Sequence, residues 1–212
     1  MSGKRRPYPS GVPAHVVHRG VNRGPVFFDQ LDRLRYLEEL RMLSSRHGVA
    51  VHAYVLMDNH VHLLLTPEVD GAVSPLIRDL CRRYVPVANR RAGRQGTLWD
   101  GRHHSAMVTS DRYVLACYRY IELNPVRAHM VRHPGAFRWS SHRANAFGCG
   151  DPVLTPHPAY EALGRDACRR RRAYEATFRG DHAERAHLLE ATRLRCALRR
   201  RHLREDGHPP PD

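Results

Sequence analysis

Two histidines lie one residue apart in a segment of the sequence that favours a β-strand. His60 and His62 flank Val61, and residues i and i+2 of a strand project from the same face. Two imidazoles would therefore converge on one spot, where they could hold a divalent metal ion that polarises a phosphoryl oxygen. The chain has 16 histidines, so this spacing also arises easily by chance. Two ordinary surface or half-buried histidines are the alternative interpretation.

A tyrosine and an asparagine share one face of a segment that favours a helix. Tyr120 and Asn124 are four residues apart, and side chains at this spacing are neighbours on a helix. A tyrosine hydroxyl is a weak nucleophile at neutral pH, but a nearby metal ion or base helps it to attack phosphorus. The Asn124 carbonyl oxygen suits a hard cation as a third ligand. Tyr120 could instead be a packing aromatic residue, and Tyr113 and Tyr118 are rival nucleophiles.

These residues need a scaffold, and the hydrophobic pattern predicts one with alternating strands and helices. Asp29 is placed as an N-cap before a run of leucines that Gly48 ends, and Pro86 is expected to kink or end the second helix. The expected strands cover residues 15–20, 49–57, 61–66 and 102–108, and the expected helices cover residues 29–47, 74–85 and 110–124. This order predicts an α+β, ferredoxin-like (RRM-like) antiparallel sheet with helices packed on one face.

The chain changes character after residue 147. Residues 148–158 resemble a linker, and residues 165–204 contain thirteen arginines but only five acidic residues. Leucines at helical spacing in this stretch predict a docked basic helix. We therefore divide the chain into a domain at 1–147, an arginine-rich helical extension at 148–204 and a disordered tail at 205–212.

The overall charge indicates a polyanionic partner. The formal net charge is +14, which favours binding to nucleic acid. All but one of the 35 basic residues are arginine; this preference could reflect a GC-rich genome, but the net charge does not depend on it. The sequence has no long apolar stretch, and its five scattered cysteines form no C-x-x-C motif. We expect a cytoplasmic protein with reduced cysteines and no membrane association.

Four sequence blocks occur in an order that is typical of a known family. The blocks are His18-Arg19-Gly20, residues 53–64 (AYVLMDNHVHLL), residues 96–102 (GTLWDGR) and residues 120–128 (YIELNPVRA). Together they resemble the single-tyrosine HUH transposases, and in particular the branch of REP-associated tyrosine transposases. The resemblance covers about residues 11–147. Pro86 departs from the family pattern, but it lies outside the matching blocks.

The resemblance implies a catalytic set and a reaction. It places the nucleophile on Tyr120 and the ligands of a Mg²⁺ or Mn²⁺ ion on His60, His62 and Asn124. Tyr120 would attack a phosphodiester in single-stranded, hairpin-forming DNA, giving a 5′-phosphotyrosine and a free 3′-OH. Attack by another 3′-OH would rejoin the strand without ATP. The sequence leaves open whether the protein is a monomer or a homodimer.

Basic and aromatic side chains near these blocks are candidates for contacts with DNA. They are Arg19, Arg23, Arg90, Arg91, Arg94 and Arg102 for phosphates, and Trp99 for base stacking. For each arginine taken alone, a solvated surface charge is the favoured interpretation, and the set as a whole is better supported than any one member. Two other functions stay open: a domesticated nickase that binds repeat hairpins, and a nucleic-acid-binding module without catalysis. The joint presence of His60, His62, Tyr120 and Asn124 argues against the second of these.

Overall fold

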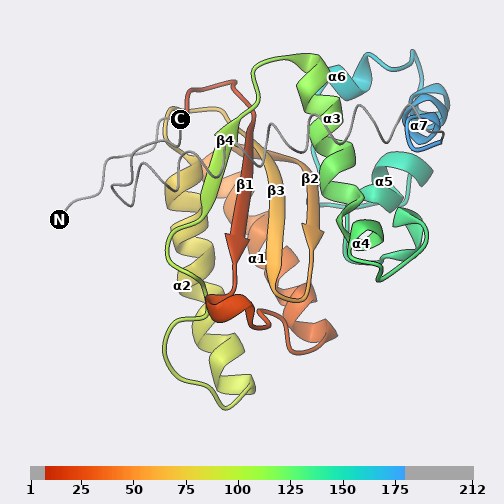
Figure 1. The fold of residues 1–212 in the computed structure, drawn as a ribbon. Helices are drawn as coiled ribbons and strands as arrows, with labels where there is room; N and C mark the ends of the chain where they lie inside the picture. Colours follow the sequence, from red (N-terminus) through yellow and green to blue (C-terminus); the bar gives the residue numbers. More distant parts are fainter. Residues whose placement is uncertain (1–7, 180–212) are drawn as a thin grey trace, which may run out of the picture.

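A four-stranded antiparallel sheet forms the centre of the protein (Figure 1). The computed structural model describes residues 8–179. The strands are β1 (Ala14–Arg19), β2 (Val49–Leu56), β3 (His60–Pro67) and β4 (His104–Met107), in the spatial order β2-β3-β1-β4. This arrangement confirms the predicted α+β, ferredoxin-like fold. Within residues 8–179, no helix is both long enough and apolar enough to cross a membrane.

Helix α1 (Gln30–His47) packs with α2 on one face of the sheet. It begins at Asp29, whose carboxylate accepts a hydrogen bond from the Asp32 backbone at 2.9 Å, and it ends at Gly48, which has a φ of 59°. Leucines that recur every three residues step around a helix by about 60° each. Leu40 and Leu43 are therefore in the core, whereas Leu31 at the start of the helix is 58% exposed.

Helix α2 (Val73–Arg91) continues through Pro86, so it does not end at the proline, which was one of the two expected outcomes. Pro86 is exposed, so the hydrogen bond that it cannot make is lost on the solvent side of the helix. The buried face continues past it, because Leu80, Tyr84 and Ala88 follow one another at four-residue intervals into the core. Packing along this face outweighs the loss of one hydrogen bond.

Helix α3 (Asp111–Glu122) covers the opposite face of the sheet, so the prediction that the helices share one face is wrong (Figure 1). Alternate residues of β2 and β3 point to this second face. Ala53, Val55 and Leu64 meet Cys117 and Ile121 there in a separate hydrophobic cluster. The central strands are apolar on both faces, and the sequence pattern alone did not show that a helix would cover the second face.

Short helices follow α3 and complete this second layer. They are α4 (Asn124–Arg127), α5 (His142–Phe147), α6 (Pro158–Glu161) and α7 (Ala167–Ala176), with the 3-10 turn η2 (Pro134–Ala136) between α4 and α5. A second 3-10 turn, η1 (Val21–Arg23), lies between β1 and α1. Tyr160 of α6 and Tyr174 of α7 belong to the same buried cluster as α3. Residues on both sides of position 147 therefore share one core, and the domain boundary at 147 stays a prediction. Residues 180–204 of the proposed extension and the proposed tail at 205–212 lie outside the described residues.

Candidate active site

His60 and His62 lie at the start of β3, on the sheet face that α3 covers. Antiparallel pairing places His60 opposite Arg19 and His62 opposite Val17 of β1. The two imidazole rings are neighbours, with centroids 5.0 Å apart and planes at 77°. The alternation of side chains along the strand thus brings the two histidines together, as their spacing predicts.

Tyr120 extends from α3 onto these histidines. Its ring meets the edge of His62 at a centroid distance of 5.7 Å and the edge of His15 at 5.5 Å. No described residue forms a hydrogen bond with the Tyr120 hydroxyl, and this oxygen is not among the buried polar atoms that lack a partner. The hydroxyl oxygen therefore keeps some exposure to solvent, although Tyr120 as a whole is only 7% exposed and belongs to the hydrophobic cluster around α3.

The rival tyrosine Tyr118 projects from a different side of α3 than Tyr120 does. It is fully buried, stacks on Tyr160 at 6.0 Å, and its hydroxyl accepts a hydrogen bond from the His157 backbone at 3.3 Å. Tyr113 lies nearly two helical turns before Tyr120 and is half-buried. Of the three tyrosines, Tyr120 is the one whose ring packs against the histidines described here.

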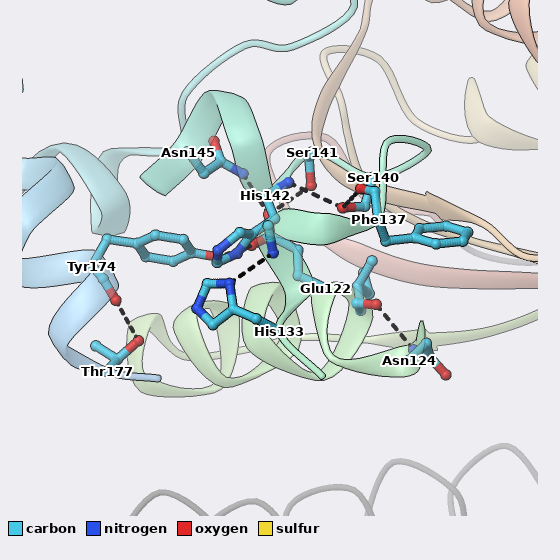
Figure 2. Close-up of polar contacts among 12 residues, drawn as sticks. Glu122, Asn124, His133, Phe137, Ser140, Ser141, His142, Asn145, Tyr174 and Thr177 are labelled. Carbon is cyan, nitrogen blue, oxygen red and sulfur yellow. Dashed lines mark hydrogen bonds and ion pairs between the residues drawn. The ribbon is translucent and has the colours of Figure 1, made fainter. Parts of the chain in front are cut away.

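Asn124 is the first residue of α4, directly after α3. Its side-chain nitrogen donates to the backbone oxygens of Tyr120 at 2.8 Å and Ile121 at 3.1 Å. Pro125 has no N–H to donate to Ile121, so the Asn124 side chain takes over that role. Figure 2 shows the amide nitrogen turned toward the helix and the carboxamide oxygen turned away from it. The side chain is thus held with its oxygen as the remaining acceptor.

His15 of β1 belongs to this site, although the sequence analysis did not select it. It is fully buried, and its Nε2 lies 2.9 Å from Nδ1 of His62. The two rings are nearly parallel, with centroids 5.1 Å apart and planes at 16°, as expected for rings joined through their nitrogens. Only the pairing register of β1 with β3 reveals this contact, because 47 residues separate the two histidines in sequence.

The second ring nitrogen of His60 also has a partner. Its Nδ1 lies 2.7 Å from the Asn59 side-chain oxygen, and the Asn59 side-chain nitrogen donates to the Arg23 carbonyl at 3.0 Å. The second bond fixes which end of the Asn59 amide faces His60. His60 must therefore donate through Nδ1, which leaves the lone pair on its Nε2.

The electrostatic environment keeps all three imidazoles neutral at pH 7. Burial and then the Arg127 charge lower the pKa of His15 to about 3, and burial and then the Arg19 charge lower the pKa of His60 to about 4. Burial is also the main reason that the pKa of His62 lies well below its usual value. Neutral imidazole is the form that binds a metal ion. The same arginines would attract an anionic substrate.

The donor set fits a divalent metal ion. Within the described part of the chain, no group of three or more His, Cys, Asp and Glu side chains is arranged to hold a metal ion. A third ligand for a metal ion at His60 and His62 would therefore come from another residue type. Asn124 offers a neutral oxygen at the end of the helix that carries Tyr120, and two imidazole nitrogens with one such oxygen suit Mn²⁺ or Mg²⁺.

Arg127 of α4 is a second residue that the sequence analysis did not select. The carbon of its guanidinium lies 4.1 Å from the centre of the Tyr120 ring, and its Nη2 donates to the Tyr120 carbonyl at 2.6 Å. A cation over the face of an aromatic ring is an attractive arrangement. In the sequence, Arg127 lies in the block at residues 120–128, seven residues after Tyr120, and this position could have identified it as a site residue.

A buried carboxylate anchors the end of α3 near Tyr120. Glu122 is fully buried and accepts hydrogen bonds from four side chains at 2.6–2.8 Å (Figure 2). The donors are Ser141, His142 Nδ1, Asn145 and the Tyr174 hydroxyl. The loop before α5, α5 itself and α7 are thereby bound to the helix that carries the candidate nucleophile.

The proposed DNA-contacting arginines differ in what they contact. Arg19, Arg23, Arg90 and Arg102 are exposed. Arg91 instead forms ion pairs with Asp29 and Asp32, and the Arg94 guanidinium lies 5.6 Å from the ring centre of Phe28. Contacts within the protein therefore already engage these last two side chains.

Trp99 is not placed to stack on a base. It is 5% exposed and belongs to the core cluster under α1 and α2. One face of its ring stacks on His18 at a centroid distance of 4.2 Å. The glycine-rich loop folds this ring inward because a large aromatic side chain gains more from burial than from exposure. The interpretation of Trp99 as a stacking surface is corrected accordingly.

Comparisons with known proteins identify one family and two similar structures. The family model described as "Transposase IS200 like" matches residues 10–124. The structure of the REP-associated tyrosine transposase bound to a REP hairpin is similar to this chain with a TM-score of 0.57 and 22% identity, over 74% of this chain and 93% of that one. A crystal structure from Deinococcus radiodurans R1, provisionally assigned as a transposase, matches with a TM-score of 0.35 and 20% identity over 54% of this chain and 91% of that one.

A comparison with curated protein sequences found no significant match. The family model nevertheless covers more than half of the chain, including β1 to β4, His60, His62, Tyr120 and Asn124. The structural match supports the same fold. This chain belongs to the family of IS200-like transposases.

Proposed function

We propose that this transposase cleaves and rejoins single-stranded, hairpin-forming DNA through a covalent bond to Tyr120, with a divalent metal ion held by His60, His62 and Asn124. The observation that carries the proposal is the contact between the Tyr120 ring and His62, because it brings the side chain of the proposed nucleophile against one of the two proposed histidine ligands.

The reaction exchanges one phosphodiester bond for another. The Tyr120 oxygen attacks phosphorus and releases its proton to solvent, the bond from phosphorus to the 3′ oxygen breaks, and that oxygen takes up a proton from solvent and leaves as a 3′-OH. Tyr120 then carries the 5′-phosphate. A bound Mg²⁺ or Mn²⁺ ion would polarise the phosphoryl oxygen and stabilise the developing charge. The reverse attack by a 3′-OH reseals the strand, and no ATP is needed because the phosphotyrosine conserves the bond energy.

The charged side chains around Tyr120 support a phosphate substrate. Arg127 lies over the Tyr120 ring, and Arg19 is close enough to His60 to lower its pKa. Exposed Arg23, Arg90 and Arg102 add positive charge elsewhere on the protein surface. A hairpin is the proposed form of the DNA because the similar transposase structure holds a REP hairpin.

We also propose a cytoplasmic location. A hydrodynamic measurement distinguishes a monomer from a homodimer.

A labelled hairpin oligonucleotide with single-stranded flanks tests this function. With Mn²⁺ present, the wild-type protein should form an adduct that survives denaturing electrophoresis. Tyr120→Phe should abolish the adduct while it leaves hairpin affinity nearly unchanged, because only the attacking oxygen is removed. Tyr113→Phe is the matched control and should still form the adduct. An adduct with Tyr120→Phe would show that another residue is the nucleophile, and binding without any adduct by the wild-type protein would favour a non-catalytic module.

A further inference from the structure

His15 contacts both a proposed metal ligand and the proposed nucleophile. Its Nε2 lies 2.9 Å from His62 Nδ1, the planes of the two rings differ by only 16°, and its ring is in a T-shaped contact with the Tyr120 ring. The side chain is fully buried. Its other nitrogen, Nδ1, is buried without a hydrogen-bond partner among the described residues. The buried His15 ring therefore uses one of its two nitrogens in a hydrogen bond and leaves the other without a partner among the described residues.

The hydrogen bond between the two rings has two forms, and they differ in what His62 can do. In one form His15 donates through Nε2 to His62 Nδ1, so the proton of the neutral His62 ring is on Nε2. In the other form His62 donates through Nδ1, and its Nε2 keeps a lone pair. Only the second form lets His62 bind a metal ion through Nε2. It also requires His15 to carry its own proton on Nδ1.

His60 provides an internal comparison. Its Nδ1 donates to the Asn59 side-chain oxygen, which leaves Nε2 with its lone pair. Metal-binding histidines usually donate their other N–H to such an acceptor, which fixes the ring orientation and the tautomer. His62 has no carboxylate, amide or backbone oxygen in this role among the described residues; His15 Nε2 occupies the position instead.

We propose that His15 is the positioning residue of this site: by accepting a hydrogen bond from His62 Nδ1, it holds His62 in the tautomer whose Nε2 binds the metal ion. This inference rests on the proposed function, because it assumes that His62 is a ligand. His15 does not itself contact the metal ion in this arrangement. Its contact with the Tyr120 ring places the nucleophile against the same support.

The tautomer can be measured directly in the metal-free, full-length protein. Long-range ¹H–¹⁵N correlation spectra of the imidazole rings distinguish a proton on Nδ1 from one on Nε2. We expect His62 and His60 both to carry it on Nδ1, and His15 also to carry it on Nδ1. Free neutral histidine favours the proton on Nε2, so the result expected for His62 is not the default. A proton on Nε2 of His62 would overturn the proposal, and this measurement needs no variant.

Two substitutions at position 15 separate positioning from packing. His15→Leu fills the space but cannot accept a hydrogen bond, whereas the side-chain oxygen of His15→Gln can. His15→Leu should weaken the binding of Mn²⁺ alone by about 10- to 100-fold, as measured by calorimetry, and should shift the His62 proton to Nε2. His15→Gln should restore much of the affinity. His52→Gln, at a buried histidine bonded to Thr155 and Thr66, is the control and should leave Mn²⁺ affinity unchanged.

The outcomes distinguish this inference from the proposed function. A folded His15→Leu protein, checked by thermal unfolding, that binds Mn²⁺ as tightly as the wild type would refute the positioning role. A wild-type protein that shows the Nδ1 proton on His62 and His15-dependent Mn²⁺ binding, yet never forms the Tyr120 adduct, would refute the proposed function and leave this inference in place.

Discussion

The proposed metal ligands each have a neighbour that determines their orientation. Asn59 faces His60, His15 faces His62, and the backbone carbonyls at the end of α3 hold the Asn124 amide. Each ligand is therefore oriented before a metal ion arrives. Preorganisation of this kind lowers the cost of binding and of catalysis.

Removal of either histidine ligand should abolish metal-dependent cleavage. His60→Ala and His62→Ala each leave one imidazole and one neutral oxygen, which is too small a set to retain Mn²⁺. We expect no adduct in the hairpin assay and Mn²⁺ affinity reduced by at least about 100-fold, while hairpin affinity changes little. EDTA should have the same effect on the wild-type protein. Full activity in EDTA would rule out the metal ion.

Arg127 should contribute to the rate through its contact with the Tyr120 ring. Arg127→Met keeps an aliphatic side chain over the ring but removes the positive charge, and a partly desolvated cation–π contact is worth about 0.5–2 kcal/mol. We therefore expect cleavage to slow by about 3- to 30-fold. Arg46→Met, at an exposed arginine near the end of α1, is the control. Equal rates for the wild type and Arg127→Met would show that this contact serves only to hold the C-terminal end of α3.

The sequence identified residues whose partners are local in the chain, and it missed those whose partners are distant. His60 and His62 share a strand, and Tyr120 and Asn124 are one helical turn apart, so spacing rules apply to both pairs. His15 reaches His62 only through strand pairing. Trp99 was misjudged for the same reason, because its burial depends on how a long loop folds onto His18.

At the scale of the elements, α3 is held to the sheet and to the C-terminal segments at the same time. Cys117 and Ile121 pack on the sheet, and Glu122 binds the loop before α5, α5 and α7. In sequence, Tyr120 lies between Cys117 and Ile121, two residues before Glu122. The helix therefore has little freedom to move its nucleophile away from the histidines without breaking a buried network.

The Glu122 network should be a main determinant of stability. Glu122→Ala leaves four buried donors without an acceptor, and we expect a loss of at least about 3 kcal/mol in the free energy of unfolding. Thermal and urea denaturation followed by circular dichroism measure this loss. Glu38→Ala, at an exposed carboxylate on α1, should leave the unfolding midpoint unchanged. A Glu122→Ala protein as stable as the wild type would mean that water replaces the missing acceptor.

Element boundaries were predictable wherever local chemistry sets them. Asp29 and Gly48 delimit α1 as expected, and Ser110 caps α3. The extent of α2 was not predictable, because packing of Tyr84 and Ala88 outweighs the local effect of Pro86. The side of the sheet that α3 covers was not predictable either, since strands that are apolar on both faces do not indicate where each helix packs.

For the molecule as a whole, the question is whether the residues beyond 147 form a separate extension. Tyr160 stacks on Tyr118, and Tyr174 lies edge-on to both rings in the cluster around α3. A truncation after residue 147 would remove both side chains from the core. Each removal resembles a large-to-small core substitution, worth about 3–5 kcal/mol, and the stability of a domain is only about 5–15 kcal/mol. We expect this truncated chain to unfold or aggregate.

A truncation after residue 179 tests the role of the basic C-terminal sequence without this complication. It keeps every interaction described above, so its unfolding midpoint should match that of the full chain. It removes residues 180–212, which contain seven arginines and six acidic residues, and six of the arginines lie in residues 191–204, where there is no acidic residue. If these arginines bind DNA, the log–log slope of hairpin affinity against salt should become shallower by roughly 0.7 for each phosphate of a single strand that the truncated protein no longer neutralises. Affinity measured at several salt concentrations gives the slope for both proteins. Identical slopes would show that these arginines do not bind the hairpin, and that charge close to Tyr120, from residues such as Arg19 and Arg127, supplies the electrostatic part of DNA binding.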